Sequence, residues 1–202
     1  MMPGMEGAPG MVFPFSVANT NHPFYYRSKT EGKWEFAKIT DKEPITTLGL
    51  AGMTAFTKDS IAKIDVYFNQ VAKIEKHKFN KLSIFHNVED TSWAITVAHP
   101  ELLDTSFINN STGATEFYFS QKLDTLSFTV TKKDSCTTAF HFYGAYLENN
   151  EPGIIYTGIG INGAATHSYL KEQLFEKHLA TVKPDLVILS IGVNDASGPG
   201  FN

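Results

Sequence analysis

Two glycine-containing loops carry the residues whose types and spacing could do chemistry. One is Gly160-Ile161-Asn162-Gly163-Ala164-Ala165, and the other is Ile191-Gly192-Val193-Asn194-Asp195. A backbone N–H at Gly163 and the side-chain amide of Asn194 would suit a developing oxyanion, which needs two converging donors. An isolated Gly-x-Asn-Asp favours an ordinary Asx-type turn, and the second glycine loop is what favours the oxyanion hole. Gly192 would allow the sharp turn, and Asp195 would hold the loop by accepting backbone N–H bonds.

The elements around these loops predict a βαβ unit. Residues 154–157 form a short apolar run, and residues 186–189 form an uninterrupted one that is typical of a parallel strand covered on both faces. Between them, apolar residues recur at helical spacing, namely Leu170, Leu174, Phe175 and Leu179. Pro184 should end this helix. Because both loops follow strands of one parallel sheet, we expect them at the same sheet edge.

Upstream of this unit, residues 24–150 have the pattern of an antiparallel sandwich. Short runs rich in Phe, Tyr, Val, Ile and Thr are broken by polar turns. Leu126, Phe128 and Val130 alternate with polar residues, as in a half-buried strand, and pairs of Phe repeat the pattern at 117 and 119 and at 140 and 142. We therefore predict a mixed fold, with a jelly-roll-like β-sandwich over 24–150 and a partial α/β unit over 151–202. Residues 1–23 would be a lead-in from the α/β domain.

Composition excludes several classes of protein. The chain has 17 basic and 21 acidic residues and no basic run, so nucleic acid is not an expected partner. Its longest apolar run, residues 186–191, is too short to span a bilayer. The seven His residues show no ligand spacing, and we expect neither a metal nor another cofactor. The single Cys136 is expected to act as a small hydrophobe.

No serine of the chain comes with an evident base. His167 and Ser168 are neighbours whose side chains should point in different directions, Ser190 is expected in a buried strand, and Ser197 in an exposed loop. The remaining histidines have simpler expectations. His141 should face solvent from its strand. His178 should lie near a helix end, where the helix dipole mildly favours a cation, so a structural role is sufficient for it. The aromatic side chains that could stack on sugar rings, if exposed, are Tyr25, Tyr26, Trp34, Trp93 and Tyr118.

Taken together, these motifs resemble a known family. Gly163 in Ile-Asn-Gly-Ala and Gly192-Val-Asn194-Asp195 look like the second and third conserved blocks of the SGNH/GDSL hydrolases. The order of β-rich module and glycine loops is similar to peptidoglycan O-acetylesterases and related bacterial proteins, in which a carbohydrate-binding-like sandwich is inserted between the first and second blocks. The segments that resemble the region after the first block are residues 10–15, 19–26 and 32–34.

This resemblance implies a flavodoxin-like α/β domain and a serine esterase that acts on an acetylated polysaccharide of the cell envelope, in the periplasm or outside the cell. In that family a serine attacks the acyl carbon and a histidine shuttles its proton. Neither the Gly-Asp-Ser nor the Asp-x-x-His block is present in these 202 residues. A lone βαβ unit also leaves its strands with unpaired edges, so we expect that flanking parts of the same hydrolase domain are missing from this segment.

Three interpretations stay open at this point. The first is a segment of an esterase with Gly163 and Asn194 as oxyanion donors. The second is a non-enzymatic glycan-binding or interaction module whose working part is the sandwich, and the third is a decayed gene product without activity. A Gly-Asp-Ser block upstream and an Asp-x-x-His block downstream in the same reading frame would decide for the enzyme.

Overall fold

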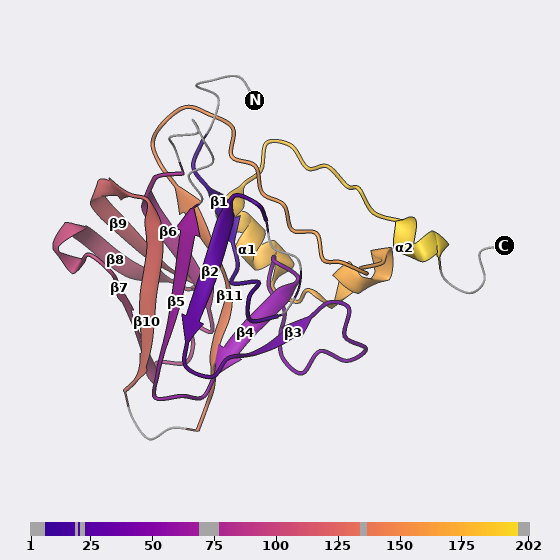
Figure 1. Cartoon of the computed structure of the whole chain (residues 1–202), viewed down its shortest axis with the longest axis horizontal. Helices are drawn as coiled ribbons and strands as arrows, with labels where there is room; N and C mark the ends of the chain where they lie inside the picture. The colour runs from indigo at the N-terminus through magenta and orange to yellow at the C-terminus, as the bar shows by residue number, and fades with distance from the viewer. Residues whose placement is uncertain (1–6, 19, 21–22, 69–76, 134–136, 198–202) are drawn as a thin grey trace.

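The computed structural model describes residues 7–18, 20, 23–68, 77–133 and 137–197. Its body consists of two antiparallel sheets that face each other, with short helices on one side (Figure 1). Cys136 lies outside the described residues.

The larger sheet has seven strands and the smaller one four. In the larger sheet the strand order is β3 (Glu35–Lys38), β4 (Met53–Thr57), β11 (Phe140–Glu148), β6 (Phe79–His86), β9 (Ala114–Leu123) and β8 (Leu103–Asn109), and β1 (Gly10–Val12) pairs with β11. In the smaller sheet the order is β2 (Tyr26–Glu31), β5 (Ile61–Phe68), β10 (Thr125–Lys132) and β7 (Trp93–Val97). Each of these strand pairs is antiparallel, which confirms the antiparallel β-rich part of the predicted fold.

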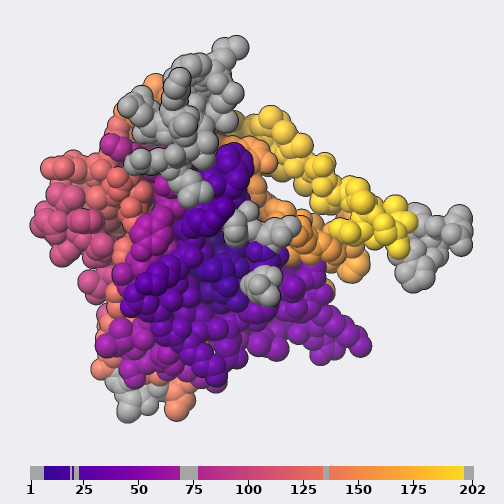
Figure 2. All heavy atoms as spheres, viewed as in Figure 1, coloured from indigo at the N-terminus to yellow at the C-terminus, as the bar shows by residue number. Residues whose placement is uncertain are grey.

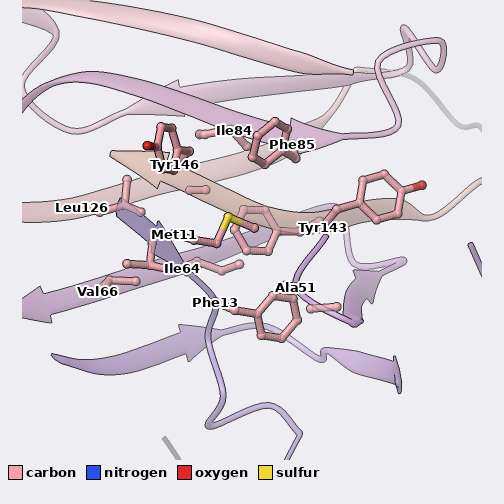
Figure 3. Packing of buried hydrophobic residues seen from close by; sticks show 14 of the residues in the cluster. Met11, Phe13, Ala51, Ile64, Val66, Ile84, Phe85, Leu126, Tyr143 and Tyr146 are labelled. Carbon is pink, nitrogen blue, oxygen red and sulfur yellow. The ribbon is translucent and has the colours of Figure 1, made fainter. Parts of the chain in front are cut away.

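A single apolar core lies between the sheets. Phe128 of β10 and Phe142 of β11 meet across it, with ring centroids 5.4 Å apart. Leu126, Phe128 and Val130 are all buried, as their alternation predicts, because a strand with one covered face turns every second side chain inward. Strand β1 adds its own residues to this core, and Met11 and Phe13 lie among the core side chains in Figure 3.

A glycine lies in β11 where β1 packs closely beside it. The register of β11 against β6 shifts between Phe142 and Gly144, and Gly144 has a φ of +128°. A side chain at Gly144 would start 2.3 Å from the Met11 Cε atom. Glycine therefore satisfies both the backbone conformation of this bulge and the close approach of β1.

Four short helices complete the described fold: η1 (Pro100–Leu102), η2 (Thr166–Lys171), α1 (Phe175–Val182) and α2 (Val193–Ala196). Helix α1 packs against the larger sheet, because the His178 ring stacks on Phe85 of β6 at 4.4 Å between centroids. The ring is fully buried, and burial lowers the pKa of His178 to about 3. His178 thus has the structural role expected for it, but as a neutral ring rather than as the cation that the helix dipole would favour. A neutral ring is required there because a charged one could not be solvated.

The predicted βαβ unit is not confirmed. Among the described residues, 186–189 belong to no strand, and in the run 154–157 only Ile154 forms a bridge. The helix between them is divided into η2 and α1, and Leu170, expected on its apolar face, is 88% exposed. A strand exists only with a hydrogen-bonding partner, and no described segment pairs with residues 186–189.

The segment before α2 exposes a row of apolar side chains. Leu186, Val187, Ile188 and Leu189 are each at least 61% exposed, and Ser190, expected in a buried strand, is exposed as well. Figure 2 shows this stretch and α2 extending from the body as an arm. His141 also departs from expectation, since it is half-buried beside the rings of Phe56 and Tyr143. None of the helices in the described part of the chain is long and apolar enough to cross a membrane.

Candidate functional site

The first glycine loop, residues 160–165, is held from below by its apolar residues. Ile161, Ala164 and Ala165 are buried, and the Ala164 N–H donates to the Ile161 carbonyl at 3.0 Å, which closes a tight turn. Gly163 lies at the tip of this turn with a φ of +81°. A Cβ atom built on Gly163 would have only the Thr40 methyl within 4 Å, at 3.9 Å. The backbone at Gly163 is therefore open to an approaching group.

The second loop starts at Gly192 and continues into α2. Gly192 has a φ of +113° and forms the N-cap of this one-turn helix, whose Ala196 N–H donates to the Gly192 carbonyl at 3.0 Å. The left-handed backbone at Gly192 turns the chain so that Asn194 faces the first loop. The Asn194 Nδ2 atom donates to the Ala164 carbonyl oxygen at 2.8 Å. The structure thus brings the Asn194 side chain next to the carbonyl of Ala164, which is the residue after Gly163.

Asp195 makes the second connection between the loops. Its carboxylate accepts the Thr166 backbone N–H at 3.0 and 2.9 Å and the Thr166 hydroxyl at 3.1 Å. The Thr166 N–H holds the pKa of Asp195 below its usual value, because hydrogen bonds to a carboxylate favour its charged form. Asp195 therefore caps the first residue of η2 from outside that helix. Sequence patterns alone do not identify Ala164 as the partner of Asn194, or Thr166 as the partner of Asp195.

The first loop is anchored on the sandwich through residues 39–52, which connect β3 to β4. The Lys171 ammonium donates to the carbonyls of Ile39 and Asp41, at 3.1 and 2.5 Å. The Leu48 N–H donates to the Gln173 side chain at 2.9 Å, and the Leu50 N–H donates to His178 Nδ1 at 3.3 Å. The sandwich thus serves as the support of η2 and α1, and through them of the Gly163 turn.

No nucleophile and base come together near these loops among the described residues. The buried Ser168 Oγ accepts the Ala165 N–H at 3.1 Å, and the neighbouring His167 is exposed. The Ser197 hydroxyl donates to the Val193 carbonyl at 2.9 Å within α2. A hydroxyl and an imidazole do meet elsewhere, since Thr115 Oγ1 lies 2.7 Å from His86 Nε2. That imidazole is buried, and burial lowers the pKa of His86 to about 4, which suits a neutral structural ring.

A buried carboxyl lies beneath the first loop. Glu172 is 7% exposed, and neither of its carboxyl oxygens has a hydrogen-bond partner among the described residues. Burial raises the pKa of Glu172 to about 8. Its Oε1 atom lies 3.1 Å from the position that a Cβ of Gly52 would take, and Ile161 fills the same corner. In the part of the chain that the structure describes, no three His, Cys, Asp or Glu side chains are placed to hold a metal ion.

Comparison with known proteins gives a relation at the level of the fold. No protein-family model matches the chain, and no curated protein matches it. Among solved structures, the chain is similar to one described as "Peptidoglycan O-acetylesterase in action, 5 min", with a TM-score of 0.61 and 21% identity. The match covers 97% of this chain and 50% of that protein, so the chain spans about half the length of its structural neighbour. At this identity the likeness shows a shared fold.

Proposed function

We propose that this chain is part of an SGNH/GDSL-type esterase that removes O-acetyl groups from a cell-wall or other polysaccharide. The observation that supports it most directly is the contact between the two glycine loops, in which Asn194 Nδ2 lies 2.8 Å from the Ala164 carbonyl. An isolated Asx turn needs no such partner from a loop 30 residues earlier. The similarity in fold to a peptidoglycan O-acetylesterase supports the same class of substrate.

In this proposal the Gly163 N–H and the Asn194 amide stabilise the negative charge that forms on the ester carbonyl oxygen. A side-chain amide has two N–H groups, and the bond to Ala164 uses one of them. The other is available for the oxyanion. Asp195 holds the loops together through Thr166, so that the donors are positioned before substrate binds, which is the condition for efficient electrostatic stabilisation.

The serine nucleophile and the histidine base would come from flanking parts of the same hydrolase domain. Residues 154–157 and 186–189 would be two strands of that domain's parallel sheet. The exposure of Leu186 to Leu189 supports this, because four consecutive apolar side chains in water are costly, at about 25 cal/mol for each Å² of apolar surface. The domain division at residues 24–150 and 151–202, and a location in the cell envelope, belong to the same proposal.

The test uses a protein that contains residues 1–202 together with an upstream Gly-Asp-Ser block and a downstream Asp-x-x-His block. Steady-state kinetics on an acetylated glycan should show that Asn194→Ala lowers kcat by about 10²–10³-fold with little change in KM. Ser197→Ala is the matched control, because Ser197 is the C-cap of the same helix and its hydroxyl donates to the Val193 carbonyl of that helix. Equal rates for Asn194→Ala and Ser197→Ala, both folded, would reduce the Gly-x-Asn-Asp match to a turn. The 202-residue chain by itself should not hydrolyse small acetyl esters.

A further inference from the structure

The outer face of the larger sheet carries two rows of side chains that the proposed oxyanion site does not use. The register of the strands aligns Phe107 with Glu116 and Ser83 in one row, and Thr105 with Tyr118 and Lys81 in the next. The intervening residues Phe117 and Leu82 point into the core, so these rows face the other way. This is also the face on which α1 packs, since the ring of Phe85, two residues after Ser83, stacks on His178.

Three of these side chains, with Glu148 of β11, form a continuous chain of contacts across four strands. The rings of Phe107 on β8 and Tyr118 on β9 are nearly parallel, at 16° with centroids 6.0 Å apart. The Lys81 ammonium of β6 lies 5.8 Å from the Tyr118 ring and forms a 2.7 Å salt bridge with Glu148 of β11. The stack starts at Phe107, which is 47% exposed at the sheet edge. Phe107 is therefore an aromatic ring that its neighbours hold rigid and solvent still reaches.

The polar groups around this ring hold one another in place. The buried Glu116 carboxylate accepts the Tyr118 hydroxyl at 2.7 Å and the Asn109 amide at 2.8 Å, and Lys81 is paired with Glu148. Thr105 and Asn109 lie on the same face of β8 as Phe107, two residues before it and two residues after it. A flat aromatic surface between fixed polar groups suits a ligand that has one apolar face and many hydroxyls.

We propose that Phe107, with Tyr118 behind it and Thr105 and Asn109 beside it, is a binding subsite for a sugar ring of a glycan chain. The ligand class rests on the proposed function, whereas the place of the subsite rests on the stack. A pyranose would lay its C–H face on Phe107 and use its hydroxyls on Thr105 and Asn109. Because the stack already fixes the ring, little side-chain freedom is lost on binding. The subsite would hold the polysaccharide on the face that carries α1.

Binding is measured by isothermal titration of the 202-residue chain with the hexamer of β-1,4-linked N-acetylglucosamine. Phe107→Ser and Phe107→Leu should each weaken binding by about ten-fold, because both remove the flat ring. Ile108→Ser is the matched control, since Ile108 is the next residue of β8, is 53% exposed and faces the opposite side. Asn194→Ala should bind like the unaltered chain, so that binding and oxyanion stabilisation fail independently.

Three results would overturn the subsite: no binding of the hexamer to the unaltered chain, the same affinity for the Phe107 variants, or an equal loss in Ile108→Ser. The last would mean that the edge of β8, rather than the ring, recognises the ligand. Analytical ultracentrifugation of the same variants provides a further check. A dimer that requires Phe107 would show that a second copy of the chain covers this face, and would also overturn the proposal.

Discussion

The side-chain amide of Asn194 donates to the main-chain carbonyl of Ala164 at 2.8 Å, and this bond fixes one glycine loop against the other. Its geometric effect is to place an amide beside the turn whose tip is Gly163. A donor that is already held by the protein does not have to reorganise when charge develops, so it is more effective than a free amide would be. The same bond limits how the neighbouring Asp195 can be oriented.

Asp195→Asn should loosen the contact with Thr166 while leaving the sandwich unaffected. The lowered pKa of Asp195 means that the contact stabilises the fold above the ordinary pKa of 3.8, and that this stabilisation is lost as the pH falls through the lower folded value. The Thr166 amide resonance, followed by NMR from pH 6 to about 2, should titrate in the unaltered chain and stay constant in Asp195→Asn. Asp185→Asn, an exposed change in the same arm, is the control. Titration that persists in Asp195→Asn would contradict the assignment.

Hydrogen exchange should divide the chain into a protected sandwich and a poorly protected arm. Residues 126–130 lie in β10 between two partner strands, whereas residues 186–189 have no strand partner among the described residues. Amides of the second segment should exchange close to the rate of an unfolded peptide. Equal protection of the two segments would mean that the arm is paired, and a dependence on protein concentration would show that the partner is another copy.

How far sequence predicts this structure depends on the range of the interactions involved. The alternation of Leu126, Phe128 and Val130 predicts β10 correctly, because a period of two depends only on which face of a strand is covered. The two glycine loops were expected at one place, and their Asn194–Ala164 contact does bring them together. That they serve as an oxyanion hole stays a prediction.

Other features depend on partners far away in the chain, and local pattern cannot give them. The helix dipole alone would mildly favour a cation at His178, yet the environment of this ring is set by Phe85 and Tyr143 of two distant strands. The apolar run 186–189 has the composition of a buried strand, but pairing requires neighbours that no periodicity specifies. Glu172 could not be foreseen either, because carboxyl groups are rarely buried without a partner.

Glu172 should make the stability of the chain depend on pH. Burial raises its pKa from 4.5 to about 8, so the folded state holds a proton that the unfolded state has lost between these values. Its contribution to stability is therefore complete below pH 4.5 and falls as the pH rises towards 8. Thermal melts of Glu172→Gln and the unaltered chain, compared across this range, should differ more at pH 8 than at pH 4.5. The buried His178 also makes the stability depend on pH, in the opposite direction. Both proteins contain His178, so its effect cancels from the difference between their melting temperatures. A difference that does not change with pH would show that Glu172 is ionised in the fold.

Gly49 should be the glycine that least tolerates a side chain at the contact between sandwich and helix. A Cβ atom there would start 2.7 Å from the Tyr143 Cβ atom and 2.8 Å from His178 Cε1. The β11 strand is fixed by its neighbours and the His178 ring by Phe85 and by its bond from the Leu50 N–H, so neither can move away freely. Gly49→Ala should therefore destabilise the chain by about 1–3 kcal/mol, as overpacking of a filled core does.

Urea unfolding measures this loss, and Gly160→Ala is the control, because a Cβ at Gly160 meets nothing within 4 Å. Since α1 carries the support of the Gly163 turn, Gly49→Ala should also speed exchange of the Thr166 amide, whereas Gly160→Ala should not destabilise the α1 contact. Equal unfolding midpoints for the two variants would mean that α1 is not packed on the sheet as described.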